Sequence, residues 1–126
     1  MNESPIFVRT HDFTCWLLSH TIQFPKSQRF VMARRVEETV LDFQERLIRA
    51  ARKRGGARSR ELQEADVLFE ILRRHIRTSV ELKLLTVRQY EYAASHLVEI
   101  GRLLGGWMKK TTESTRREPV VGTGPK

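Results

Sequence analysis

The sequence predicts an all-α protein, an up-down-up-down antiparallel four-helix bundle. Apolar residues recur at alternating spacings of three and four in four separate segments. This is the pattern of helices that each bury one face, and it fits no strand. The segments are joined by connections of about three to five residues, and connections so short make consecutive helices antiparallel.

The first predicted helix covers residues 4–24. Ser4 can act as its N-cap, with Pro5 at the first helical position. The helix ends near Phe24, because the residue before Pro25 is pushed out of the helical conformation. Its apolar face is predicted to contain Ile6, Thr10, Phe13, Leu17 and Phe24.

The second predicted helix is capped by Ser27 and closed by Gly55 and Gly56, because glycine commonly follows the end of a helix. Its buried face is predicted to contain Ala33, Val36, Val40, Phe43, Leu47 and Ala50, widened by Leu41 and Ile48.

The third predicted helix is capped by Ser59. Glu61 then lies in its first turn, where the helix dipole favours a carboxylate. The apolar face is predicted to contain Leu62, Ala65, Phe69, Leu72 and Ile76, continued by Val80 and Leu84.

The fourth predicted helix begins at a capping box, since Thr86 and Gln89 have the spacing at which each side chain satisfies the other's backbone N–H. Its face contains Tyr90, Ala93, Leu97, Ile100, Leu104 and Trp107, and the pattern stops after Lys110. Residues 1–110 are therefore predicted to form the bundle domain. Residues 111–126, a mixture of Thr, Gly, Pro and charge, are predicted to be a flexible tail.

Length and composition indicate one cytoplasmic domain. A chain of 126 residues can bury a core without disulfides, and the single Cys15 cannot form an internal bridge. No apolar run reaches the length of a membrane span, and the N-terminus lacks the pattern of a secretory signal. A soluble intracellular protein is expected.

The basic residues are concentrated in one stretch. The chain has a formal net charge of +8, and a run without acidic residues accounts for most of it: Arg46, Arg49, Arg52, Lys53, Arg54, Arg58 and Arg60. Like charges at helical spacing repel, so such a run favours an anionic partner, for which nucleic acid is the leading candidate.

Three arginines of the third helix have acidic neighbours. Glu70 precedes Arg73 and Arg74 by three and four residues, and Glu81 follows Arg77 by four. Such pairs are usual on a solvated helix face. If these arginines and the basic run project to one side, they form a surface for phosphate contacts without base readout. Charge alone leaves two interpretations open, a nucleic-acid surface and an inert solvated face.

Catalytic and metal-binding patterns are missing. Di-iron bundles need a glutamate three residues before an inward-facing histidine, and none of the four histidines has one. A lone Cys15 with nearby histidines is too few ligands for zinc. We expect no enzyme activity, no metal and no cofactor.

Two glycines and several apolar residues off the main faces suggest self-association. Gly101 and Gly105 share one helix face, which suggests the close approach of another helix. The other residues would be exposed in an isolated bundle: Trp16, Leu18, Tyr92, Val98, Leu103 and Met108. The predicted interface comprises Gly101, Gly105, Trp107, Leu103, Tyr92 and Trp16. The alternatives are tight packing inside one bundle, fraying, and ordinary scattered hydrophobic residues.

Residues 24–110 resemble the accessory variability determinant (Avd) proteins of diversity-generating retroelements, and a wider group of small bundles that includes ribosomal RNA intervening-sequence proteins. The resemblance lies in Phe24-Pro25 followed by Ser27, Arg29 and Phe30, in RQYEYA from Arg88, and in EIGRLLGGW from Glu99 to Trp107.

The resemblance implies a four-helix bundle that assembles into a barrel-shaped homopentamer with a positively charged surface. It also implies a partner reverse transcriptase, template RNA or cDNA, and a requirement in mutagenic cDNA synthesis (mutagenic retrohoming). Arg73 and Arg77 match arginines of the family's third helix. With Arg74 and the seven residues of the basic run they form the predicted nucleic-acid site. The strongly basic second connection and the longer tail depart from the family pattern.

The rival hypothesis is a structural bundle of the intervening-sequence type. Its basic face would dock an acidic protein, or RNA outside any retroelement. Binding to structured RNA separates the first hypothesis from a bundle that docks an acidic protein and does not bind nucleic acid.

Overall fold

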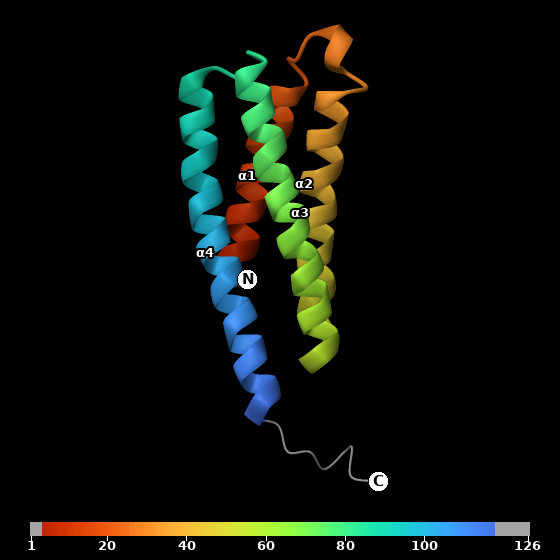
Figure 1. The fold of residues 1–126 in the computed structure, drawn as a ribbon, viewed down its shortest axis with the longest axis vertical. Coiled ribbons are helices and arrows are strands. Elements are labelled where there is room, and N and C mark those ends of the chain that lie inside the picture. Colours follow the sequence, from red (N-terminus) through yellow and green to blue (C-terminus); the bar gives the residue numbers. More distant parts are fainter. Residues whose placement is uncertain (1–3, 118–126) are drawn as a thin grey trace.

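The computed structural model of the protein describes residues 4–117, which form four α-helices and one short 3-10 helix. The α-helices are α1 (Pro5–Thr21), α2 (Met32–Ala51), α3 (Gly55–Glu81) and α4 (Val87–Arg117), with the 3-10 helix η1 (Lys26–Gln28) between the first two. Consecutive helices run in opposite directions (Figure 1). The predicted all-α four-helix bundle is confirmed.

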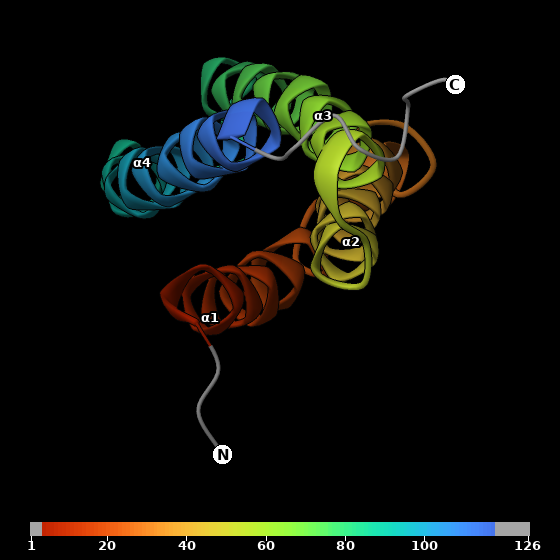
Figure 2. The ribbon, with the colours of Figure 1, turned by 90° about the horizontal axis from the view of Figure 1, so that it is seen from below.

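The four helices pack as a ring around one core. Helices α1 and α3 each contact both α2 and α4, so α1 lies diagonally opposite α3, as the view along the bundle shows (Figure 2). Aromatic rings fill the centre, and those of Phe43 and Phe69 lie 5.5 Å apart. This ring fits the antiparallel order that short connections impose.

Most of the predicted apolar faces are buried. All the positions named for α1 and the six main positions of α2 lie in the core, and α3 and α4 bury their central positions from Leu62 to Ile76 and from Ala93 to Leu104. The prediction that Leu41 and Ile48 widen the buried face of α2 is wrong, because both side chains are exposed. Each follows a buried residue by one position, and one step along a helix turns a side chain about 100° away from the core.

The connection between α1 and α2 is longer than predicted and spans residues 22–31. Ser27 does not cap α2, because it lies inside η1. The cap is supplied instead by Gln28, whose Oε1 accepts a hydrogen bond from the Met32 backbone N–H at 3.2 Å. α1 ends at Thr21, three residues before the predicted end near Phe24, and Phe24 is buried in the connection that precedes Pro25.

The connection between α2 and α3 consists of Arg52, Lys53 and Arg54 alone. Gly55 has φ 54°, a left-handed conformation that glycine adopts without strain, and it begins α3. The prediction that Gly55 and Gly56 close α2 is therefore wrong, and Ser59 lies within α3 instead of capping it. Because α3 starts at Gly55, Glu61 lies beyond its first turn, close to the end of α2.

The start of α4 follows the prediction. The Gln89 N–H donates to Thr86 Oγ1 at 3.0 Å, and the Thr86 N–H donates to Gln89 Oε1 at 2.9 Å, so both halves of the capping box are formed.

The end of α4 differs from the prediction, because the helix continues past Lys110 to Arg117 and buries Thr111. Residues 118–126 of the predicted tail lie outside the described residues. The last turns of α4 extend beyond the start of α1 (Figure 1), so α2, α3 and α4 alone form this end of the bundle. No helix in the described part of the chain is long and apolar enough to cross a membrane.

Candidate nucleic-acid interface

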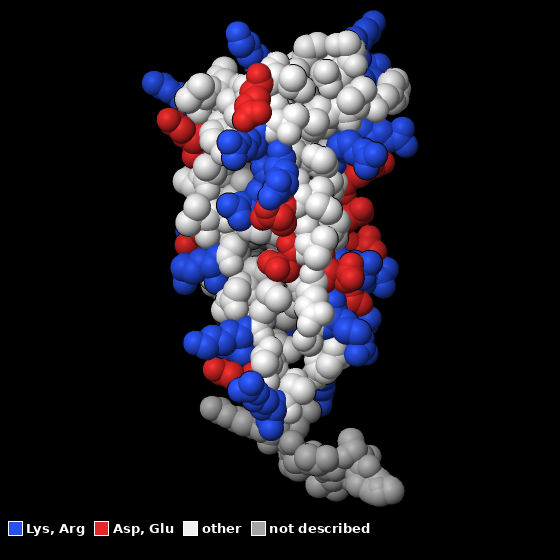
Figure 3. Space-filling model, viewed as in Figure 1, with Lys and Arg blue, Asp and Glu red and all other residues white. Residues whose placement is uncertain are grey.

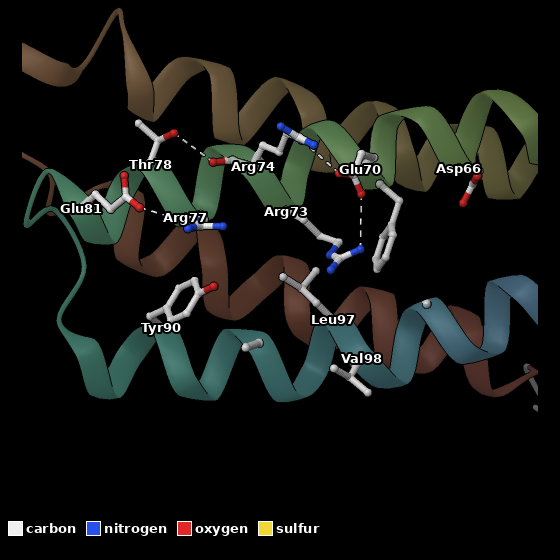
Figure 4. Close-up of a pocket in the computed structure, with 13 residues that line it drawn as sticks. Asp66, Glu70, Arg73, Arg74, Arg77, Thr78, Glu81, Tyr90, Leu97 and Val98 are labelled. Atoms are coloured by element: carbon white, nitrogen blue, oxygen red, sulfur yellow. Dashed lines mark hydrogen bonds and ion pairs between the residues drawn. The ribbon is translucent and has the colours of Figure 1, made fainter.

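A groove of about 1070 Å³ runs between α3 and α4. Arg73 and Arg77 extend from α3 toward α4, and Arg74 also lines the groove but lies farther from α4 (Figure 4). The wall that α4 contributes is largely apolar and includes Leu97 and Val98. The two arginines that the resemblance singles out therefore line one groove, with guanidinium groups above an apolar surface.

Each of these arginines has an acidic neighbour on its own helix. Arg73 and Arg74 both contact Glu70, at 3.3 and 3.0 Å, and Arg77 contacts Glu81 at 3.2 Å. All the side chains involved are at least half exposed. Exposed pairs of this spacing stabilise a helix by only about 0.3–0.5 kcal/mol, so a phosphate can displace the carboxylates at small cost.

The groove as a whole is balanced in charge. Its lining contains three arginines and three acidic residues, Asp66, Glu70 and Glu81. Basic and acidic side chains alternate along this face of the molecule (Figure 3). The groove can bind phosphates through its arginines, but its three carboxylates make it less attractive to anions than a uniformly basic surface would be.

The basic run is less free than the sequence predicts. Glu61 is buried beside the end of α2, where Arg46 donates to it at 2.8 Å and Lys53 forms a second ion pair. Arg49 pairs with Glu45, which precedes the run, at 2.8 Å. The expectation that these residues lack acidic neighbours is wrong, because the early start of α3 brings Glu61 to the run and Glu45 lies one helical turn away.

Arg58 is held by two structural contacts. Its Nε donates to the Ala50 carbonyl at 2.9 Å and its Nη2 to the Ala51 carbonyl at 3.4 Å, which satisfies the last carbonyls of α2. Its guanidinium carbon also lies 5.8 Å from the centre of the Trp107 ring. Arg58 thus fastens the end of α2 to α4, a role that spacing in the sequence does not reveal.

Three members of the run, Arg52, Arg54 and Arg60, have no acidic partner among residues 4–117 and are exposed. Together with Arg58, whose contacts are to backbone carbonyls and an aromatic ring, they are the members of the run whose charge no carboxylate offsets in the described residues. They lie at the end of the bundle where α2 and α3 are joined.

Glu61 has a strongly depressed pKa. Hydrogen bonds from Lys53 and then Arg46 lower the pKa of this carboxyl from 4.5 to about 2, against the opposing effect of burial. Because the pKa is lower in the folded protein than in the unfolded chain, the ionised pair stabilises the fold above about pH 4.5. That stabilisation is lost as the pH falls toward 2.

We expect Glu61→Gln to destabilise the protein most above pH 5. The difference from wild type in free energy of unfolding should shrink steadily between pH 5 and pH 2, measured by urea denaturation. Glu113→Gln is the matched control, because Glu113 is exposed and forms no ion pair among the described residues. A constant difference between wild type and Glu61→Gln across this range would show that the ion pairs do not stabilise the fold.

The two glycines of the predicted oligomer interface have different surroundings. A Cβ added at Gly101 would lie 3.1 Å from Cε2 of Phe69, so the close approach at this position is to α3 of the same chain. A Cβ at Gly105 would meet nothing within 4 Å. Gly101 therefore serves packing within the bundle, the alternative that the sequence left open, and Gly105 faces open space.

The aromatic residues of that predicted interface mostly pack within the chain. The Trp107 ring lies edge-on to Phe7 at 5.9 Å, and the Trp16 ring lies 4.9 Å from Tyr92. Four residues expected to be exposed are instead half-buried against the core: Trp16, Leu18, Leu103 and Met108. Only Tyr92 and Val98 of that set are exposed, at 47% and 73%. The four half-buried side chains, from α1 and α4, therefore pack against the core of their own chain.

The described part of the chain contains no group of three or more His, Cys, Asp or Glu side chains that could hold a metal ion.

The chain matches a known protein family. The model of the bAvd-like family matches residues 6–111, which span all four helices. No curated protein matches the chain.

Proposed function

The chain belongs to the bAvd-like family, and we propose that it is a non-catalytic accessory protein of a diversity-generating retroelement. In this role it binds the reverse transcriptase and the template RNA or its cDNA and supports mutagenic reverse transcription in the cytoplasm. Its contribution is to hold nucleic acid beside the polymerase by neutralising phosphates.

The observation that carries this proposal is the set of cations without acidic partners in residues 4–117. Arg52, Arg54 and Arg60 are exposed and close together in the sequence, on a chain of net charge +8. Arg73 and Arg77 add guanidinium groups whose carboxylate neighbours are exposed and weakly bound. Contacts of this kind bind the backbone of nucleic acid with little dependence on its sequence.

We also propose that the protein assembles as a homopentamer, as its family resemblance implies. The exposed side chains of Tyr92 and Val98 and the open face at Gly105, all on α4, support an interface on that helix. Exposed apolar surface is typical of subunit contacts.

A gel-shift titration with structured RNA and single-stranded DNA tests the proposal. The proposed function requires binding to RNA at low salt, and the proposed homopentamer requires a mass by light scattering of about five times the 14.8 kDa of one chain. If the protein instead binds an acidic polypeptide and ignores RNA, the rival function of a structural bundle with an acidic protein partner replaces it.

A further inference from the structure

We propose that a small pocket at the end of the bundle not covered by α1 binds a phosphate group of a nucleic-acid strand. The pocket has a volume of about 310 Å³ and is lined by Arg54, Gly55, Arg58, Thr111, Ser114 and Thr115. The pocket lies between the first turn of α3 and the last turns of α4, where the sequence predicts a loop and a flexible tail. This inference rests on the proposed function and names one site for it.

The pocket combines positive charge with the absence of acidic lining. Two of its lining residues are arginines and none is acidic, whereas the α3–α4 groove balances three arginines with three acidic residues. Arg54 has no acidic partner in residues 4–117. Arg58 is fixed by the Ala50 and Ala51 carbonyls through Nε and Nη2, and these bonds leave its Nη1 available. An anion entering here therefore displaces no carboxylate from the lining.

Backbone donors at the start of α3 face the same end. The first backbone hydrogen bond to the N-cap residue is donated by the Arg58 N–H, so the N–H groups of Gly55, Gly56 and Ala57 precede the intrahelical ladder. The N-cap is Arg54, whose side chain accepts none of them, and the first turn contains no acidic residue. A helix end of this kind attracts anions through its N–H groups and its dipole.

The hydroxyl of Thr111 is open to the pocket. This residue is only 6% exposed and lines the pocket, no side-chain hydrogen bond among the described residues engages its Oγ1, and the fully buried atoms without a partner are Thr10 Oγ1 and His96 Nδ1 instead. The Thr111 hydroxyl can therefore donate to a ligand in the pocket. Ser114 adds a second free hydroxyl, while the Thr115 hydroxyl already donates to the Thr111 carbonyl at 2.8 Å. A phosphate oxygen in the pocket would accept a hydrogen bond from the Thr111 hydroxyl.

The first test uses inorganic phosphate as the probe and the full chain, followed by amide resonances in NMR. Saturable shifts at Gly55, Gly56 and Ala57 are expected. Arg54→Gln should weaken phosphate binding about tenfold and Thr111→Val about three- to tenfold, because each removes one bond to a charged group. Thr111→Val keeps the buried volume, so its fold should be retained. Arg88→Gln is the matched control, because it removes the same charge at the opposite end of the bundle.

The second test measures RNA binding against salt concentration. Arg54→Gln should reduce the slope of log affinity against log salt by about 0.7–0.9, the value of one phosphate contact, and Arg88→Gln should leave it unchanged. Salt-dependent RNA binding that both variants reduce equally would overturn the pocket and leave the proposed function intact. Phosphate bound at the pocket by a protein that binds no RNA would overturn the proposed function, and with it the assignment of the pocket to nucleic acid.

Discussion

The double variant Arg73→Gln, Arg77→Gln is expected to bind structured RNA on the order of 10–100-fold more weakly than wild type at about 50 mM salt, since each lost phosphate contact removes about 0.7–0.9 from the slope of log affinity against log salt. Both side chains line the α3–α4 groove. Glutamine retains length and helix propensity, so the charge is the main change.

Stability should hardly change in this double variant. The ion pairs to Glu70 and Glu81 are exposed, and their loss should cost only about 0.3–0.5 kcal/mol each. Loss of RNA binding without loss of folding then assigns the effect to the groove. Thermal unfolding and gel-shift titration on the same samples provide both measurements.

Arg34→Gln combined with Arg102→Gln is the matched control. Arg34 pairs with Glu38 at 3.1 Å and Arg102 with Glu99 at 2.6 Å, both side chains are exposed, and neither lines the groove. This control removes the same charge and the same number of ion pairs. If it weakens RNA binding as much as the double variant in the groove, net charge alone drives binding and the groove has no special role.

Gly101→Leu is expected to destabilise the protein by about 1–3 kcal/mol, the usual effect of overpacking a core. The added side chain would occupy space within 3.1 Å of the Phe69 ring, which is itself buried and packed against Phe43. Urea unfolding followed by circular dichroism measures the loss.

Gly105→Leu provides the comparison, because the same substitution one turn later meets open space. Replacing a helical glycine by leucine should stabilise the helix by roughly 0.5–1 kcal/mol. If Gly101→Leu is neutral instead, the close packing against Phe69 is incorrect. If Gly105→Leu changes the molecular mass by light scattering, the open face of α4 is a subunit contact.

The helical fold could be predicted from the sequence because the signals for it are local. The buried face of α2 follows directly from its apolar spacing, and Thr86 and Gln89 form the capping box that their spacing indicates. Element ends were harder to predict. Gly55 is compatible with closing α2 or with opening α3, and only packing decides between them.

The candidate site was predicted less completely, because ion pairs between helices depend on three-dimensional neighbours. Arg46 and Glu61 are fifteen residues apart in the chain, yet they lie in contact at 2.8 Å. The contact of Arg58 with Trp107 and the pocket beside Thr111 likewise join segments that are distant in sequence. Helical periodicity has no information on such contacts.

The most direct test is the slope of log affinity against log salt for wild-type protein and a structured RNA, between about 50 and 200 mM salt. If unpaired arginines bind the phosphate backbone, affinity falls linearly on this plot with a slope of several units. Affinity that is unchanged over this range, or no binding at the low-salt end, would contradict a polyanion-binding role for this bundle.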